Sequence, residues 1–133
     1  MPSFGTLKAD TLTHSTAGSL DTNFVVNGSS KAWVNFNGTS TLAIDDSFNM
    51  ASVTDNGTGN YTPAATNSMN NTDYAFSLAA REESSGYGGF IGLNDSDNQT
   101  ASGFQIRCRK GSVDTGTGDD RALVTTAYFG DLA

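Results

Sequence analysis

Apolar and polar residues alternate in short runs along most of the chain from Lys31 to the end. In the runs 32–36, 74–80 and 104–109 every second residue is apolar, and clusters of Gly, Asn, Asp and Ser separate the runs. A period of two is typical of a β-strand with one buried face, whereas no stretch carries the apolar stripe of a helix of three turns. The pattern therefore predicts an all-β chain.

Turn signals recur about every 8–12 residues after Lys31, which is typical of a sandwich or a barrel. We predict an antiparallel β-sandwich of about eight strands. The Asn37-Gly38 pair favours a type I′ hairpin turn, and Asp45-Asp46 predicts a polar break after the second strand. The predicted strands are 32–36, 41–44, 48–53, 60–62, 74–80, 90–93, 104–109 and 121–129.

The last predicted strand, 121–129, has an alternating set of residues that we assign to one side. Leu123, Thr125, Ala127 and Phe129 share one face of this strand, and we expect them to face the core. In the strand 104–109 the assignment is sharper, because Phe104, Ile106 and Cys108 alternate with polar or charged residues.

The first 30 residues differ from the rest and predict an N-terminal arm, residues 1–30, ahead of the domain 31–133. The arm is polar apart from a short cluster at 24–26, and we expect an extended segment with one or two short strands. Such a segment buries too little surface to offset its ordering entropy. We expect it to pack on the domain or on neighbouring subunits of a homo-oligomer.

Charge and composition exclude some classes of binding partner. The net charge is −7 and the pI about 4.3, so nucleic acid and anionic membranes are not expected partners. The N-terminus lacks the apolar segment of a signal peptide, which predicts that the protein is made in a cytoplasm and does not cross a membrane by a signal of its own. The single cysteine, Cys108, excludes an internal disulfide and is expected to be a small buried apolar residue.

Candidate chemistry is sparse, and we predict that the chain is not an enzyme and holds no cofactor or metal. The one histidine, His14, lies in the arm without an evident catalytic partner. Adjacent carboxylates such as Asp119-Asp120 are common in any acidic protein and do not by themselves indicate a glycosidase. Asp95 and Asp97 offer oxygen ligands at alternate positions but lack the Gly and the terminal Glu of a calcium loop, so a metal there stays an open alternative to a solvated loop.

One polar face stands out as a contact surface. Gln105, Arg107 and Arg109 share one side of the strand 104–109, and Tyr87 lies in a nearby Gly-rich loop. Strong donors gathered on one face are typical of contacts to glycans or anions. The alternative is a solvated face, or one that forms salt bridges with the acidic surface of a sister subunit.

Several short sequence motifs are similar to those of a known protein family. The stretches 32–36 (AWVNF), 47–49 (SFN) and 54–62 (TDNGTGNYT) resemble a module of tail-fibre and other virion proteins of marine and cyanobacterial phages. The opening 5–12 and the close 126–131 also resemble the ends of such proteins, and the likeness is strongest over 31–66. Members often have an Arg where Asp45 or Asp46 stands here.

The resemblance implies an oligomeric, all-β structural protein of the virion, and the analogy with phage fibres and decoration proteins makes a trimer the first expected oligomer. We expect a tail-fibre or tail-associated adhesion component that takes part in host attachment, with other virion proteins as partners. Members of the family often carry a longer shaft before the module, whereas only a short arm precedes it here. The first alternative to a tail-fibre component is therefore a capsid decoration or head-fibre protein that stabilises the shell. A small carbohydrate-binding or carbohydrate-active protein is the second.

Overall fold

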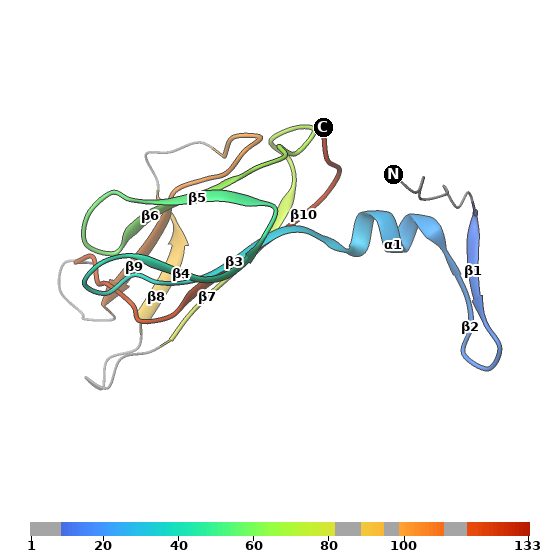
Figure 1. The fold of residues 1–133 in the computed structure, drawn as a ribbon, viewed down its shortest axis with the longest axis horizontal. Coiled ribbons are helices and arrows are strands. Elements are labelled where there is room, and N and C mark those ends of the chain that lie inside the picture. Colours follow the sequence, from blue (N-terminus) through green and yellow to red (C-terminus); the bar gives the residue numbers. More distant parts are fainter. Residues whose placement is uncertain (1–8, 82–88, 95–98, 111–116) are drawn as a thin grey trace, which may run out of the picture.

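A computed structural model describes residues 9–81, 89–94, 99–110 and 117–133 of the chain (Figure 1). The described part is mostly β, with antiparallel sheets and one short helix, which confirms the expected all-β class. The elements are β1 (Thr11–His14), β2 (Gly18–Asp21), α1 (Thr22–Gly28), β3 (Ser30–Asn37), β4 (Ala43–Phe48), β5 (Met50–Asp55), β6 (Asn60–Ala65), β7 (Ala75–Ala80), β8 (Gly89–Leu93), β9 (Ile106–Lys110) and β10 (Val124–Phe129).

The strands after α1 form two four-stranded sheets, which we call the body. One sheet has the order β4-β3-β10-β7 and the other the order β5-β6-β9-β8. The chain passes from the first sheet to the second at Asn49, whose φ of 54° lies in the left-handed region. Asn49 holds this corner through its side chain, which donates to the Lys31 carbonyl at 2.9 Å and accepts from the Asn67 amide at 2.9 Å.

Residues from both sheets meet in one core. Val34 and Phe36 of β3 are fully buried, as are Ile106 and Cys108 of β9, which confirms the inward faces predicted for these two strands. Aromatic rings join the layers: Phe36 lies edge-on to Tyr61 with centroids 5.1 Å apart, and Phe104, Tyr74 and Tyr128 form a second group. Such pairs add stabilisation beyond the area that they bury.

The predicted inward face of the last strand is wrong. In β10 the buried residues are Val124, Thr126 and Tyr128, whereas the residues between them are only half-buried. β10 lies between β3 and β7 and pairs with both, so apolar residues occur on its two faces. Tyr128 decides the orientation, because its hydroxyl reaches across the core to the Pro63 carbonyl at 3.3 Å.

Two local predictions about the first hairpin are also wrong. β3 and β4 do pair as a hairpin, but residues 38–42 form a five-residue loop, and the positive φ is at Ser40 rather than at Asn37-Gly38. The Asn37 side chain instead accepts from the Thr39 amide at 2.8 Å. Asp45 and Asp46 do not break the chain, because β4 is an exposed edge strand whose carboxylates reach water.

Residues 9–29 form an arm that projects from one end of the body (Figure 1). β1 and β2 pair as a hairpin, in line with the expected short strands. The apolar cluster 24–26 was expected to be extended, but it lies in α1. Local contacts explain the helix: the Thr22 hydroxyl binds the Ala9 carbonyl at 2.8 Å before it, and the Lys31 ammonium binds the carbonyls of Val26 and Ser29 at its end.

Candidate functional site

The predicted contact face lies on the outer side of the sheet that contains β9. Arg107 and Arg109 alternate with the buried Ile106 and Cys108 and are half-buried, as predicted from the period of two. Gln105 directly precedes the strand and shares this side. The structure thus brings three of the four predicted residues together, and Tyr87 lies outside the described residues.

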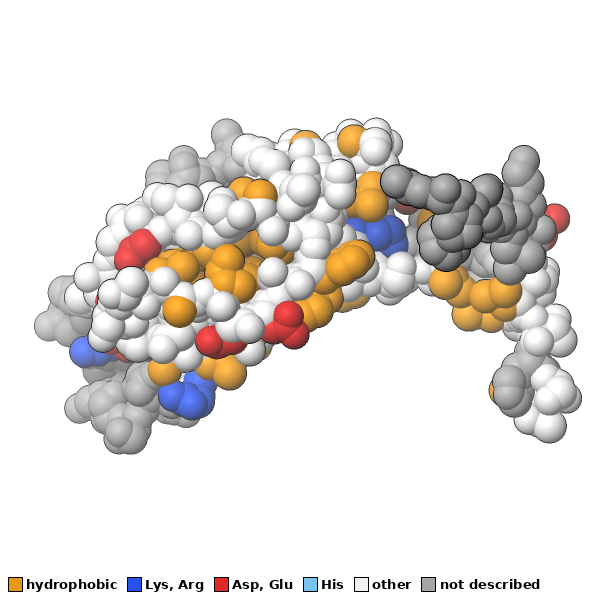
Figure 2. Space-filling model, in the orientation of Figure 1, with side chains coloured by type: hydrophobic (Ala, Val, Ile, Leu, Met, Phe, Trp, Pro, Cys, Tyr) orange, Lys and Arg blue, Asp and Glu red, His pale blue; other side chains and the backbone are white. Residues whose placement is uncertain are grey.

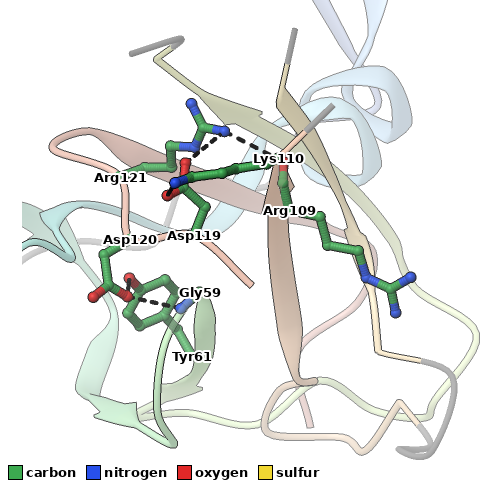
Figure 3. Close-up of polar contacts among 7 residues, drawn as sticks. All are labelled: Gly59, Tyr61, Arg109, Lys110, Asp119, Asp120 and Arg121. Atoms are coloured by element: carbon green, nitrogen blue, oxygen red, sulfur yellow. Dashed lines mark hydrogen bonds and ion pairs between the residues drawn. The ribbon is translucent and has the colours of Figure 1, made fainter. Parts of the chain in front are cut away.

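Gln105 and Arg109 already have partners within the chain. The Gln105 side chain accepts a hydrogen bond from the side chain of Asn94, a buried residue at the end of β8. Arg109 takes part in a further interaction, and its side chain extends away from the neighbouring polar cluster (Figure 3). These two residues are therefore held in place before any ligand arrives.

Arg107 has an incomplete set of partners. It lies opposite Asn60 in the β6–β9 pair, and the buried atoms Arg107 Nε and Asn60 Oδ1 both lack a hydrogen-bond partner. A donor and an acceptor complement one another, so a rotation of either side chain can satisfy both. On the other side of Arg107 lies Gly92 of β8, where a Cβ would meet no atom of the described residues within 4 Å.

A second polar group, which the sequence did not predict, closes one end of the body. We call it the end cluster: Gly59, Tyr61, Lys110, Asp119, Asp120 and Arg121 (Figure 3). Asp120 Oδ1 accepts from the Tyr61 hydroxyl and from the Gly59 amide, both at 2.7 Å. Asp119 accepts from Arg121 at 2.8 Å and lies 3.6 Å from the Lys110 ammonium. The cluster joins the β5–β6 turn to the segment before β10.

The end cluster is structural in character. Arg121 is only 2% exposed, and its guanidinium also donates to the Arg109 carbonyl at 3.3 Å, so the buried charge is paired and hydrogen-bonded. Burial, together with Asp120, raises the pKa of Tyr61 far above its usual value. Burial raises the pKa of the nearby Cys108 thiol to about 11, which keeps it protonated and unreactive at neutral pH. Both carboxylates of the predicted Asp119-Asp120 pair serve the fold.

Apolar residues are exposed on the arm and on the body next to it, another feature that the sequence did not predict. Phe24 of α1 is 66% exposed and Phe48 at the end of β4 is 55% exposed. In Figure 2 hydrophobic side chains gather on the arm and on the nearest part of the body, with a hollow between the two. Phe48 was expected inside a strand, and the structure places it at the end of β4 opposite Trp33, on the face of the sheet that points away from the core.

Phe48 borders an open groove of about 390 Å³ at the corner between β4 and β5. The groove is also lined by Lys31, Asn49, Met50 and Leu132, and Leu132 is 43% exposed. Large exposed apolar side chains gathered in one place mark an interaction surface more often than a plain solvated one.

Metal, membrane and family relationships add no further assignment. Among the described residues no three His, Cys, Asp or Glu side chains come together as a metal site would require, and Asp95 and Asp97 lie outside them. In the same part of the chain no helix is long and apolar enough to cross a membrane. Comparisons with protein-family models, with curated proteins and with solved structures each gave no match.

Proposed function

We propose that this chain is a non-enzymatic structural protein of a bacteriophage particle, with a β-sandwich body and an arm that joins it to sister copies and to other virion proteins. The observation that carries the proposal is the projecting arm, whose apolar side chains are exposed to solvent while the body has its own buried core. Because the described core residues of the body include no residue of the arm, the arm is available for contacts with other subunits. A trimer is the first expected state.

Two further observations support a structural role. The similarity to phage virion proteins is strongest over 31–66, which spans β3 to β6 and therefore both sheets of the body. The best-defined polar group, the end cluster, uses its two carboxylates, Arg121 and Tyr61 to tie loops of the body together, which is a structural use of these side chains.

Within the particle we propose a tail-fibre or tail-associated adhesion component. The supporting feature is the outer face of β9, which carries the half-buried Arg107 and Arg109 side by side with the polar Gln105. A host-surface glycan or another anionic group suits such donors. We expect Arg107→Ala with Arg109→Ala to reduce adsorption of the phage to host cells, with Arg81→Ala on the other sheet as the control. Unchanged adsorption with normal assembly would remove this face from the proposal.

The virion assignment is tested by locating the protein on intact particles. Antibodies raised against the purified chain, detected by immunogold electron microscopy, should label the tail at a few to a few dozen copies. Dense labelling of the head would instead support the capsid decoration or head-fibre protein. Particles that carry no label, and whose digested proteins contain no peptide of this chain, would contradict a virion role. Depolymerising activity of the purified chain on host polysaccharide would contradict the non-enzymatic role.

A further inference from the structure

The arm has a conformation that it cannot maintain by its own contacts. A lone two-stranded hairpin is marginal in water, and a helix shorter than roughly 12–15 residues gains too few hydrogen bonds to offset its nucleation. Here a hairpin of two four-residue strands precedes a seven-residue helix without a buried residue. Leu12 and Leu20 face each other on the hairpin, and both remain more than two-fifths exposed. The arm therefore needs a surface to pack against.

The composition of α1 indicates what kind of surface that is. The helix has the sequence TNFVVNG and carries no charged residue. Phe24, Val25 and Val26 are exposed on it by 66%, 40% and 56%. A helix that stays in water usually shows a charged face, whereas the centre of a protein interface is depleted of charge and enriched in aromatic residues. The partner surface is therefore apolar.

The groove at the β4–β5 corner offers apolar side chains on the same chain, set among the uncharged polar residues Ser47, Asn49, Thr66 and Asn67. Its exposed apolar side chains are Phe48 and Leu132, with Met50 beside them, and its volume lies in the range of pockets that hold a small ligand, roughly 300–1,000 Å³. An aromatic side chain fits that space. Lys31 is the one charged residue of the groove lining, and its ammonium is already bound to the carbonyls of Val26 and Ser29.

The contacts of Lys31 also disfavour packing of an arm into its own groove. The residue lines the groove and at the same time holds the end of α1, so the arm starts at the rim of the groove and runs away from its own body (Figure 1). To fold back, α1 would have to break both bonds to Lys31. A neighbouring copy can fill the groove while these bonds stay intact.

We propose that α1 of one copy, with Phe24 as its anchor, packs into the groove formed by Phe48, Met50 and Leu132 of a second copy. Every copy carries both surfaces, so the exchange closes into a symmetric dimer or a ring such as the expected trimer. This inference deepens the self-assembly that is part of the proposed function and does not depend on the place of the protein in the virion.

The first test measures the oligomeric state of point variants of the full chain. Light scattering coupled to size-exclusion chromatography should show an oligomer for the unmodified chain. Phe24→Asp and Phe48→Asp should each weaken association by roughly tenfold or more, as for a central aromatic anchor. Leu93→Asp is the matched control, because Leu93 is 41% exposed on β8, the edge strand at the far side of the sheet, and should leave association unchanged.

A second test identifies the contact even if an aspartate variant folds poorly. One preparation carries Phe24→Cys and the other Leu132→Cys, and the two are mixed under mild oxidation. A disulfide-linked heterodimer is expected, and a mixture with Leu93→Cys in place of Leu132→Cys should give none. Cys108 is fully buried and does not compete.

Each outcome decides the proposal. A monomeric chain at high concentration would overturn it and the proposed self-assembly, and the groove would then belong to a different protein. An oligomer that is insensitive to Phe24→Asp and yields no cross-link would overturn only the arm exchange. Particle labelling is a separate measurement, so failure of the virion role is distinguishable from both.

Discussion

Thr126 is the residue whose replacement gives the sharpest test of the core. Its side chain is 1% exposed, and its hydroxyl oxygen has no hydrogen-bond partner. The residue lies in the middle of β10, in register with Val34 of β3 on one side and with Leu78 of β7 on the other. The hydroxyl therefore faces an apolar layer, where an unsatisfied polar group costs about 1–3 kcal/mol.

Thr126→Val should stabilise the protein, because valine has nearly the same shape and removes the unsatisfied hydroxyl. The added methyl group contributes up to about 0.8 kcal/mol from burial. Some of this gain is lost to imperfect fit, so we expect a net increase of about 1–2 kcal/mol in the free energy of unfolding. With an m-value of roughly 2 kcal/mol/M, the urea midpoint should rise by about 0.5–1 M.

Two control variants isolate the hydroxyl as the cause. Thr126→Ser keeps the hydroxyl and removes the buried methyl, so it should lower the free energy of unfolding by about 1 kcal/mol. Thr125→Val changes the half-buried opposite face of the same strand and should stay within about 0.5 kcal/mol. If Thr126→Val lowered the midpoint while Thr126→Ser left it unchanged, the hydroxyl would have a partner in solution and the reasoning would be wrong.

Three further predictions concern the end cluster and the buried ionisable groups. Gly59→Ala should lower the free energy of unfolding, measured in urea, by about 3 kcal/mol or more, because the φ of Gly59 is +68° and a Cβ would overlap neighbouring backbone. Gly92→Ala, where a Cβ would meet no described atom within 4 Å, should lower it by under about 1 kcal/mol. Asp120→Ala should lower the free energy of unfolding by about 2–3 kcal/mol, since it removes the acceptor shared by the Gly59 amide and the Tyr61 hydroxyl. A double-mutant cycle with Tyr61→Phe should show coupling between the two residues. Additive losses of stability would contradict the shared contact. Burial raises the pKa of Cys108 to about 11 and raises the pKa values of the buried tyrosines above that. Above about pH 9 the unfolded chain therefore loses protons that the folded chain keeps, and the urea midpoint should fall between pH 9 and 11. A constant midpoint over this range would contradict the burial of these groups.

The predictions that the structure confirms come from strands with two chemically distinct faces. In β9, Ile106 and Cys108 alternate with Arg107 and Arg109, and a strand cannot bury the arginines without leaving charges unpaired in the core. The β5–β6 turn is a similar case, because it falls between the predicted strands 48–53 and 60–62, where Gly57 and Gly59 supply two positive φ angles. In both cases the decisive interactions act between residues close in sequence.

The wrong predictions arise where the place of a strand in its sheet decides the outcome. β10 is a central strand with apolar residues on both faces, and its inward face depends on Tyr128 reaching Pro63, which is 65 residues away in sequence. β4 is an edge strand, so Asp45 and Asp46 can stay within it. The alternation of side chains specifies that a strand exists but not which neighbours it has.

The candidate surfaces follow the same division. The polar face of Arg107 and Arg109 was predictable because one strand presents it. The end cluster was not, because Tyr61 and Asp120 are 59 residues apart and only sheet packing joins them. Exposure of Phe24 and Phe48 was not predictable either. From sequence alone an aromatic residue is assigned to the core, and only the position of its helix or strand in the fold shows whether it is exposed.

By itself, the sequence of this protein determined an all-β class, an arm ahead of a body and the inward faces of its most amphipathic strands, because period-two patterning and turn chemistry act over a few residues. The orientation of β10, the carboxylate that anchors Tyr61 and the groove beside Lys31 were decided by tertiary structure. Each of these depends on contacts between segments far apart in the chain, whose energies exist only once the two sheets have packed.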